Sequence, residues 1–118
     1  MIDTETVESF NTRLTVDTTN LKKLTPGQRD QVKHYGSQAE ALIKNRDLAM
    51  FVHHYKFELA DMLVGVTGYA DADNQQRIAI AHQLTGIDQF VTSLRRAVYQ
   101  KNKMISFESQ PEAQNTGF

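Results

Sequence analysis

The residues of this chain best suited to metal chemistry are two adjacent histidines and two acids that follow them. They are His53, His54, Glu58 and Asp61. Imidazole nitrogens and carboxylate oxygens bind divalent metals, and the four-residue step from His54 to Glu58 is one helical turn. His82 or Asp88 could complete a site from a second helix. Carboxylate-bridged sites in helical bundles use Glu-x-x-His pairs, however, and the chain has none. We therefore predict no metal and no cofactor, and a solvated or interfacial histidine pair.

Signals for nucleophilic catalysis and for phosphate binding by a loop are absent from the sequence. The chain has no cysteine and no Gly-x-Ser-x-Gly elbow, and its 6 glycines form neither Gly-x-x-x-x-Gly-Lys nor Gly-x-Gly-x-x-Gly. We therefore predict that the protein is not an enzyme.

A basic cluster near the end of the second half of the chain is the best argument for nucleic-acid binding. Its members are Arg95, Arg96, Lys101 and Lys103, with Tyr99 among them. Closely spaced cations can neutralise phosphates, and a symmetric oligomer would multiply the patch. The competing interpretation is that cations in the last turns of a helix complement its dipole and face water. The second interpretation is the one we favour.

These residues lie in two long stretches that have apolar residues at helical spacing. The stretch from Asp73 to about Met104 has apolar positions at steps of three and four, which place them on one helical face: Ile80, Leu84, Ile87, Val91, Leu94 and Val98. An earlier stretch, from Thr25 to about Val66, has a matching stripe: Val32, Tyr35, Ala39, Leu42, Ala49, Val52, Leu59 and Leu63. The sequence predicts an all-α fold in which the two stretches pack as antiparallel neighbours.

Capping signals open both stretches, and one polar run could divide the first. Thr25-Pro26-Gly27-Gln28 combines an N-cap hydroxyl, a proline at the first helical position and a Gln three residues on. Asp73 is the expected cap of the second stretch. At Lys44-Asn45-Arg46-Asp47, either Asn45 or Asp47 could cap a new helix. A long helical hairpin and a three-helix bundle therefore both stay open, and Gly36 or Gly86 could mark a close helix approach.

The apolar stripes are wider than one antiparallel seam can cover. Five large side chains widen them: Phe51, Phe57, Met62, Ile78 and Phe90. Since two helices share only one seam, we expect these residues to form an oligomer interface that completes the bundle. A three-helix monomer would bury much of the same surface, and is the competing account.

The two ends of the chain differ in composition from its middle. Residues 1–24 are rich in Thr and Asn, and residues 12–18 alternate as a short strand would, so we expect an extended N-terminal arm. Residues 25–107 form the helical domain. Residues 108–118 contain Gln, Glu, Pro and Asn and are expected to be a flexible tail.

Composition limits the class of protein further. A chain of 118 residues is typical of one domain, and no segment approaches the roughly 18 consecutive apolar residues that span a bilayer. Acids near the N-terminus do not suit a signal peptide, and the absence of cysteine is consistent with a cytoplasmic or virion-interior location. With a formal net charge of -1, the chain as a whole has no electrostatic attraction to nucleic acid or acidic membranes.

In general make-up, as a small cysteine-free helical chain with a Thr-rich arm and a polar tail, the sequence resembles small phage-encoded assembly and accessory proteins. No motif carries this resemblance, so it assigns no residues. We predict a non-enzymatic helical oligomer that acts by protein–protein binding in a structural, adaptor or inhibitor role. The alternative is a small nucleic-acid-binding helical protein that uses the Arg95–Lys103 face.

Overall fold

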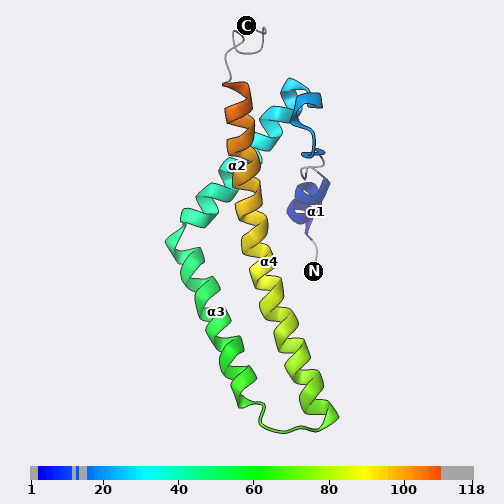
Figure 1. Ribbon diagram of the computed structural model, residues 1–118, viewed down its shortest axis with the longest axis vertical. Coiled ribbons are helices and arrows are strands. Elements are labelled where there is room, and N and C mark those ends of the chain that lie inside the picture. The colour runs from blue at the N-terminus through cyan, green and yellow to red at the C-terminus, as the bar shows by residue number, and fades with distance from the viewer. Residues whose placement is uncertain (1–2, 12, 14–15, 110–118) are drawn as a thin grey trace, which may run out of the picture.

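The protein is all-α. The computed structural model describes residues 3–11, 13 and 16–109, and within them it contains no strand (Figure 1). The elements are α1 (Thr4–Asn11), a 3-10 turn (Leu21–Lys23), α2 (Pro26–Lys44), α3 (Arg46–Gly65) and α4 (Asp71–Glu108). The prediction of an all-α fold is confirmed.

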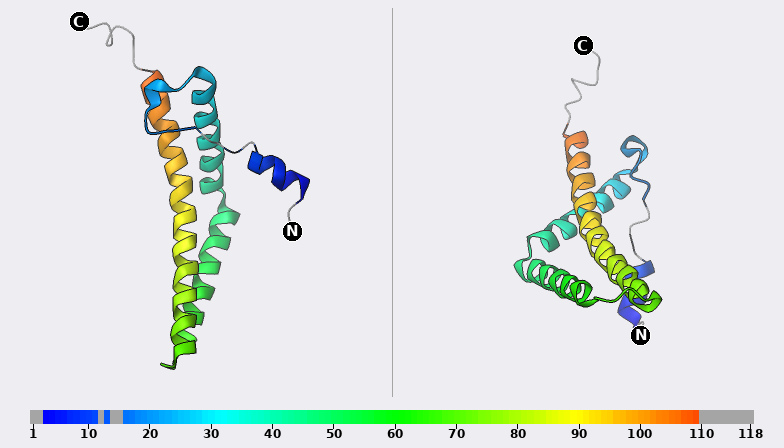
Figure 2. Two further views of the ribbon diagram at one scale, coloured as in Figure 1. Left: turned by 90° about the vertical axis from the view of Figure 1, so that its right-hand side faces the viewer. Right: turned by 60° about the horizontal axis from the view of Figure 1, so that its bottom comes forward.

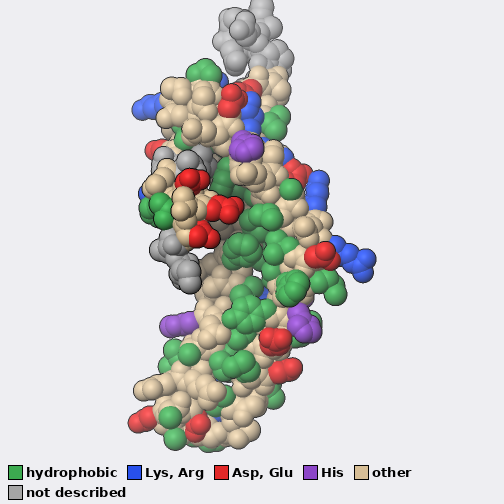
Figure 3. Space-filling model, turned by 180° about the vertical axis from the view of Figure 1, so that it is seen from behind, with side chains coloured by type: hydrophobic (Ala, Val, Ile, Leu, Met, Phe, Trp, Pro, Cys, Tyr) green, Lys and Arg blue, Asp and Glu red, His purple; other side chains and the backbone are tan. Residues whose placement is uncertain are grey.

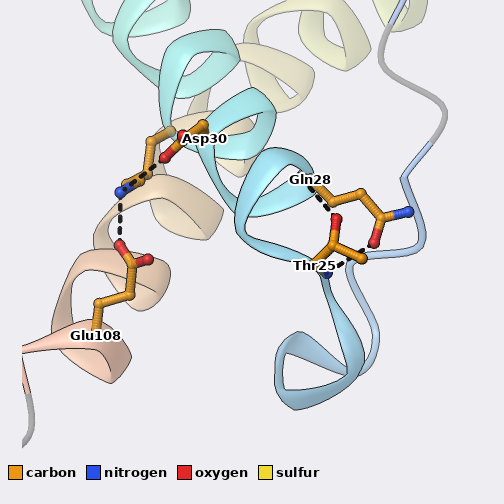
Figure 4. Close-up of polar contacts among 5 residues, drawn as sticks. Thr25, Gln28, Asp30 and Glu108 are labelled. Carbon is orange, nitrogen blue, oxygen red and sulfur yellow. Dashed lines mark hydrogen bonds and ion pairs between the residues drawn. The ribbon is translucent and has the colours of Figure 1, made fainter.

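Helix α2 begins with the predicted capping box. The backbone N–H of Gln28 donates to the Thr25 hydroxyl at 3.2 Å, and the Thr25 N–H donates to the Gln28 side-chain oxygen at 3.0 Å (Figure 4). Pro26 occupies the first helical position, where its missing N–H costs nothing. These contacts stabilise the start of the helix at the residue that the sequence indicates.

The first apolar stretch is broken at Asn45, so the hairpin with one continuous helix is the wrong alternative. Asn45 has φ -74° and ψ 113°, which ends α2. Its side chain then accepts the N–H of Leu48 at 3.0 Å and caps α3. After the break α3 takes a new direction: α2 crosses one half of α4, whereas α3 runs beside the other half (Figures 1 and 2).

Helix α4 starts before its predicted cap. Its first residue is Asp71, and Asp73 lies one turn inside, where its carboxylate accepts the N–H of Ala70 at 3.1 Å. The Arg77 guanidinium donates to the carbonyl of Val66 at 3.0 Å and also to that of Gly68, which fixes the loop between α3 and α4. Asp73 was therefore correctly placed near a helix start, but it is not the N-cap.

Most of the buried side chains gather at one end of the molecule. The core cluster there consists of Leu21, Leu24, Val32 and Met104, with Val16 and Phe107 packed against it. Next to this cluster α2 crosses α4 at Gly36 and Ala97, both buried. Beyond the crossing, where α3 runs beside α4, Leu59 of α3 and Ile80 of α4 are the buried hydrophobics among the described residues. The molecule is accordingly long and thin, with extents of 68 × 39 × 29 Å.

The ends of the chain differ from the expected extended arm and tail. Residues 4–11 form α1, because the Asp3 carboxylate accepts the N–H of Thr6 at 2.8 Å and opens a helical turn. No residue of α1 is buried. Of the expected strand, residues 12, 14 and 15 lie outside the described residues, and the others are not in a strand. Glu108 belongs to α4 and accepts a 2.6 Å bond from Lys33, while the rest of the expected tail, residues 110–118, lies outside the described residues (Figure 4).

None of the helices that the structure describes is long and apolar enough to cross a membrane.

Candidate interaction surface

Helix α3 carries large apolar side chains around most of its circumference. One side packs toward α4 and includes Val52, Leu59 and Leu63. On one flank of that side lies the Phe57 row: Met50, His53, Phe57, Ala60 and Val64, all exposed. On the other flank lies the Phe51 row: Phe51, Tyr55 and Met62, also exposed. The strip between the two rows is entirely polar, and it consists of Asp47, His54, Glu58 and Asp61.

All five residues predicted to form an oligomer interface are exposed in the single chain. Phe51 is 76% exposed and Phe57 69%, whereas Met62, Ile78 and Phe90 are about half exposed. The structure does not bring them onto one face. Phe51 and Met62 share a row, Phe57 lies on the opposite flank of α3, and the two α4 residues are separated by about a third of a turn around their helix. The sequence analysis did not single out three further members of the rows, Met50, Tyr55 and Val64. Met50 and Val64 each lie seven residues from Phe57, and Tyr55 lies four residues from Phe51, so the sequence contained the signal.

A hollow of about 540 Å³ separates α3 from α4 just after the break at Asn45. Its apolar lining comes from three helices: Leu42, Ile43, Leu48, Ala49, Val52, Phe90, Val91 and Leu94. One side of its rim is charged, where Lys56 and Asp88 form a 2.9 Å ion pair. Seen from behind, hydrophobic side chains gather over the middle of the molecule, where α2 gives way to α3 (Figure 3). The change of direction at Asn45 thus leaves apolar surface that the chain itself does not fill.

The basic cluster divides between two sides of α4. Arg95, Arg96, Tyr99 and Lys103 are exposed, and the Lys103 ammonium lies 6.0 Å from the centre of the Tyr99 ring. Lys101 is 9% exposed and forms an ion pair with Glu40 of α2. The prediction that Lys101 joins the other cations on one face is therefore wrong, because helical spacing turns it toward the crossing with α2.

The ion pair of Lys101 changes the acidity of its partner. A hydrogen bond from Lys101, and then one from Lys44, lower the pKa of Glu40 from 4.5 to about 2. The charge of Lys101 is thus compensated inside the molecule, and it is not available to a phosphate.

Of the remaining cations of the cluster, Lys103 borders a second hollow, of about 470 Å³, whereas Arg95 lines the first hollow and Arg96 lines neither of the two. The second hollow is lined by Lys22 of the 3-10 turn together with Tyr99 and Lys103, and its other polar residues are Thr19, Asn20, Asn102 and Ser106. The sequence did not indicate that Lys22, far away in the chain, would join this group.

The histidine and carboxylate residues do not converge. His54 lies 3.7 Å from Glu58 on the exposed strip of α3, and Asp88 is paired with Lys56. Among the described residues no three histidine, aspartate or glutamate side chains come together in a way that could hold a metal ion. The residues weighed as ligands are therefore distributed over separate surfaces.

Comparisons of the chain with protein-family models, with curated proteins and with solved structures found no match.

Proposed function

We propose that this protein is a non-enzymatic helical oligomer that acts by protein–protein binding, in a structural, adaptor or inhibitor role, and that α3 is its main binding element. One observation carries the proposal: large apolar side chains lie exposed on both flanks of α3, among them Phe51, Phe57 and Val64. Burying such a side chain is worth about 1.5–3 kcal/mol. A surface of this kind is typical of an interface.

The shape of the chain supports the same proposal. Its radius of gyration is 20.2 Å, whereas a compact domain of 118 residues has about 13–14 Å. Most of its core lies at one end, so α3 has few buried neighbours of its own. Association would cover the surface that the fold leaves open.

The mass of the protein in solution tests this proposal. We expect light scattering at low and high salt to report a dimer or larger assembly whose mass is insensitive to salt, because the surface is apolar. Replacing Phe51 and Phe57 together by Ser should lower the mass while circular dichroism keeps its helical signal. Tyr69→Ser, which changes an aromatic residue that is 87% exposed outside α3, is the matched control and should leave the mass unchanged. A monomer at every concentration, together with no protein partner, would contradict the proposal.

Nucleic-acid binding is a second candidate, and the position of Lys22 favours it. Lys22 and Lys103 border the same hollow as Tyr99, whose ring could stack on a base. We expect any affinity for a single-stranded oligonucleotide to fall steeply with salt, and to be reduced by changing Arg95, Arg96 and Lys103 to Ala. Arg46→Ala, on α3, is the control. Equal affinity of the triple variant and the control would remove this candidate.

A further inference from the structure

The Phe57 row has the spacing of a coiled-coil seam. Met50, Phe57 and Val64 are seven residues apart, and His53 and Ala60 fall between them at the steps of three and four that heptads require. Met50 is 60% exposed and Val64 79%, so the row is open along its length. Helix α4 packs against another side of α3, and no other described element lies along this flank (Figures 1 and 2).

We infer that the Phe57 row is the seam for α3 of a second copy of this chain, packed antiparallel about a two-fold axis at Phe57. The inference rests on the proposed function and names the partner and its orientation. In this arrangement Phe57 meets the partner's Phe57, and Met50 lies opposite the partner's Val64. Each residue of the row therefore meets an apolar residue when the partner's helix runs in the opposite direction. An interface about a two-fold axis requires this, because both copies use the same surface.

The charges beside the row suit the antiparallel orientation. Asp47, His54 and Asp61 also repeat every seven residues and run along the edge of the row. In a parallel pair Asp61 would instead face the partner's Lys56, whose ammonium is already paired with Asp88 of its own chain. The antiparallel pair places Asp61 beside the partner's His54, a side chain that can donate a hydrogen bond to a carboxylate. The same contact occurs twice because of the two-fold axis.

The distribution of charge over residues 16–109 favours the antiparallel orientation. Residues 16–45 and 93–109, which form the crossing of α2 and α4, contain nine lysines and arginines against four acids. Residues 46–92, which form α3 and the first half of α4, contain three against six. A parallel dimer would place like ends side by side, whereas an antiparallel dimer places the basic end of each copy near the acidic arm of the other.

Single cysteines test the seam directly, because the chain has no cysteine of its own. The variants are Met50→Cys, Phe57→Cys and Val64→Cys, each treated as the full-length assembly with a short bismaleimide that alkylates two nearby thiols. We expect Phe57→Cys to give a covalent dimer by itself. Met50→Cys and Val64→Cys should each give less than a tenth of that yield alone, but should cross-link when the two are co-expressed, one with a size tag.

The co-expressed pair keeps Phe57 in place, so loss of the central aromatic residue cannot explain a negative result. Phe51→Cys, on the Phe51 row and 76% exposed, is the control and should not cross-link. Self-cross-linking of all three test variants would mean a parallel seam and would overturn the inference.

Light scattering on the same samples separates this inference from the proposed function. A dimer that cross-links only through Phe51→Cys, or through none of the variants, would overturn the Phe57 seam and leave the proposed function standing. A monomer under all conditions would overturn both.

Discussion

At the scale of the residue, the contact between Gly36 and α4 decides how closely α2 and α4 approach. A Cβ atom at position 36 would lie 2.6 Å from the carbonyl oxygen of Ala97 and would overlap the Cβ of Lys101. The obstacles are backbone and the root of a side chain, neither of which can move aside easily. The crossing therefore depends on a residue without a side chain.

Gly36→Ala should lower the free energy of unfolding by about 1–3 kcal/mol, because the added methyl group forces the helices apart. Chemical denaturation followed by circular dichroism measures the change. Gly86→Ala is the matched control: a Cβ there meets nothing within 4 Å, so the better helix propensity of Ala should stabilise the protein by about 1 kcal/mol. Equal effects of the two variants would contradict the close contact at Gly36.

The ion pair at this crossing makes stability depend on pH. The pKa of Glu40 is held at about 2 in the folded chain, below its usual 4.5, so its contribution is fully present above pH 4.5 and is lost as pH falls toward 2. We expect thermal melts of Glu40→Gln and of the unaltered protein to differ clearly at pH 6 and to converge between pH 4.5 and 2. Glu58→Gln, on the exposed strip of α3, is the control and should keep the pH dependence of the unaltered protein.

Lys101 also shows what sequence reasoning about sites can miss. Its charge suggested an exposed position beside Arg95 and Arg96. Its spacing, four residues after Ala97 and three before Met104, places it on the buried side instead, and both of those neighbours are buried. The position of Lys101 around the helix therefore predicted its burial better than its charge did. The ion pair with Glu40, 61 positions away in the chain, carried no sequence signal.

At the scale of the element, helix starts were predictable where local hydrogen bonds define them. Thr25 and Gln28 form their box within four residues, so the sequence alone located the start of α2. The sequence placed the N-cap of α4 at Asp73, because aspartate is common both at the N-cap and at the third helical position. Asp73 occupies the third position. Helix α1 was not predicted, although Val7 and Phe10 lie three residues apart, because the helix has only 8 residues and none of them is buried. The direction that α3 takes after Asn45 depends on packing, and no local pattern encodes it.

Asn45→Ala should lower the free energy of unfolding by about 1 kcal/mol, since it removes the side-chain cap of α3 and favours continuation of α2. Urea denaturation measures the loss. Asn102→Ala, at an exposed position inside α4, should change stability far less. If the two substitutions cost the same, the cap contributes nothing.

At the scale of the whole molecule, stability is unevenly distributed. The crossing of α2 and α4 contains the core cluster, whereas the arm formed by α3 and the first half of α4 has only Leu59 and Ile80 as fully buried hydrophobics. Regions with few buried contacts open more readily than regions with many. The long single helix α4 therefore connects a stable end to a weak one.

Hydrogen exchange should report this gradient. In the Phe51→Ser, Phe57→Ser variant, amides around Val32 and Met104 should exchange slowest, and amides in the middle of α3 should exchange at least tenfold faster. In the unaltered protein, association should slow exchange in α3 and leave the crossing nearly unchanged. Uniform protection along the monomeric variant would contradict the gradient.

Because α2 and α3 both pack on one unbroken helix, α4 works as a spacer of fixed length. Its 38 residues span about 57 Å, and Asp88, which pairs with Lys56 next to Phe57 on α3, lies about 16 Å along the axis from Tyr99, beside the basic hollow. A molecule bound at α3 and another bound at Tyr99 would be held apart by that distance, whatever each of them is. The chain can therefore set the separation of two partners as well as join them.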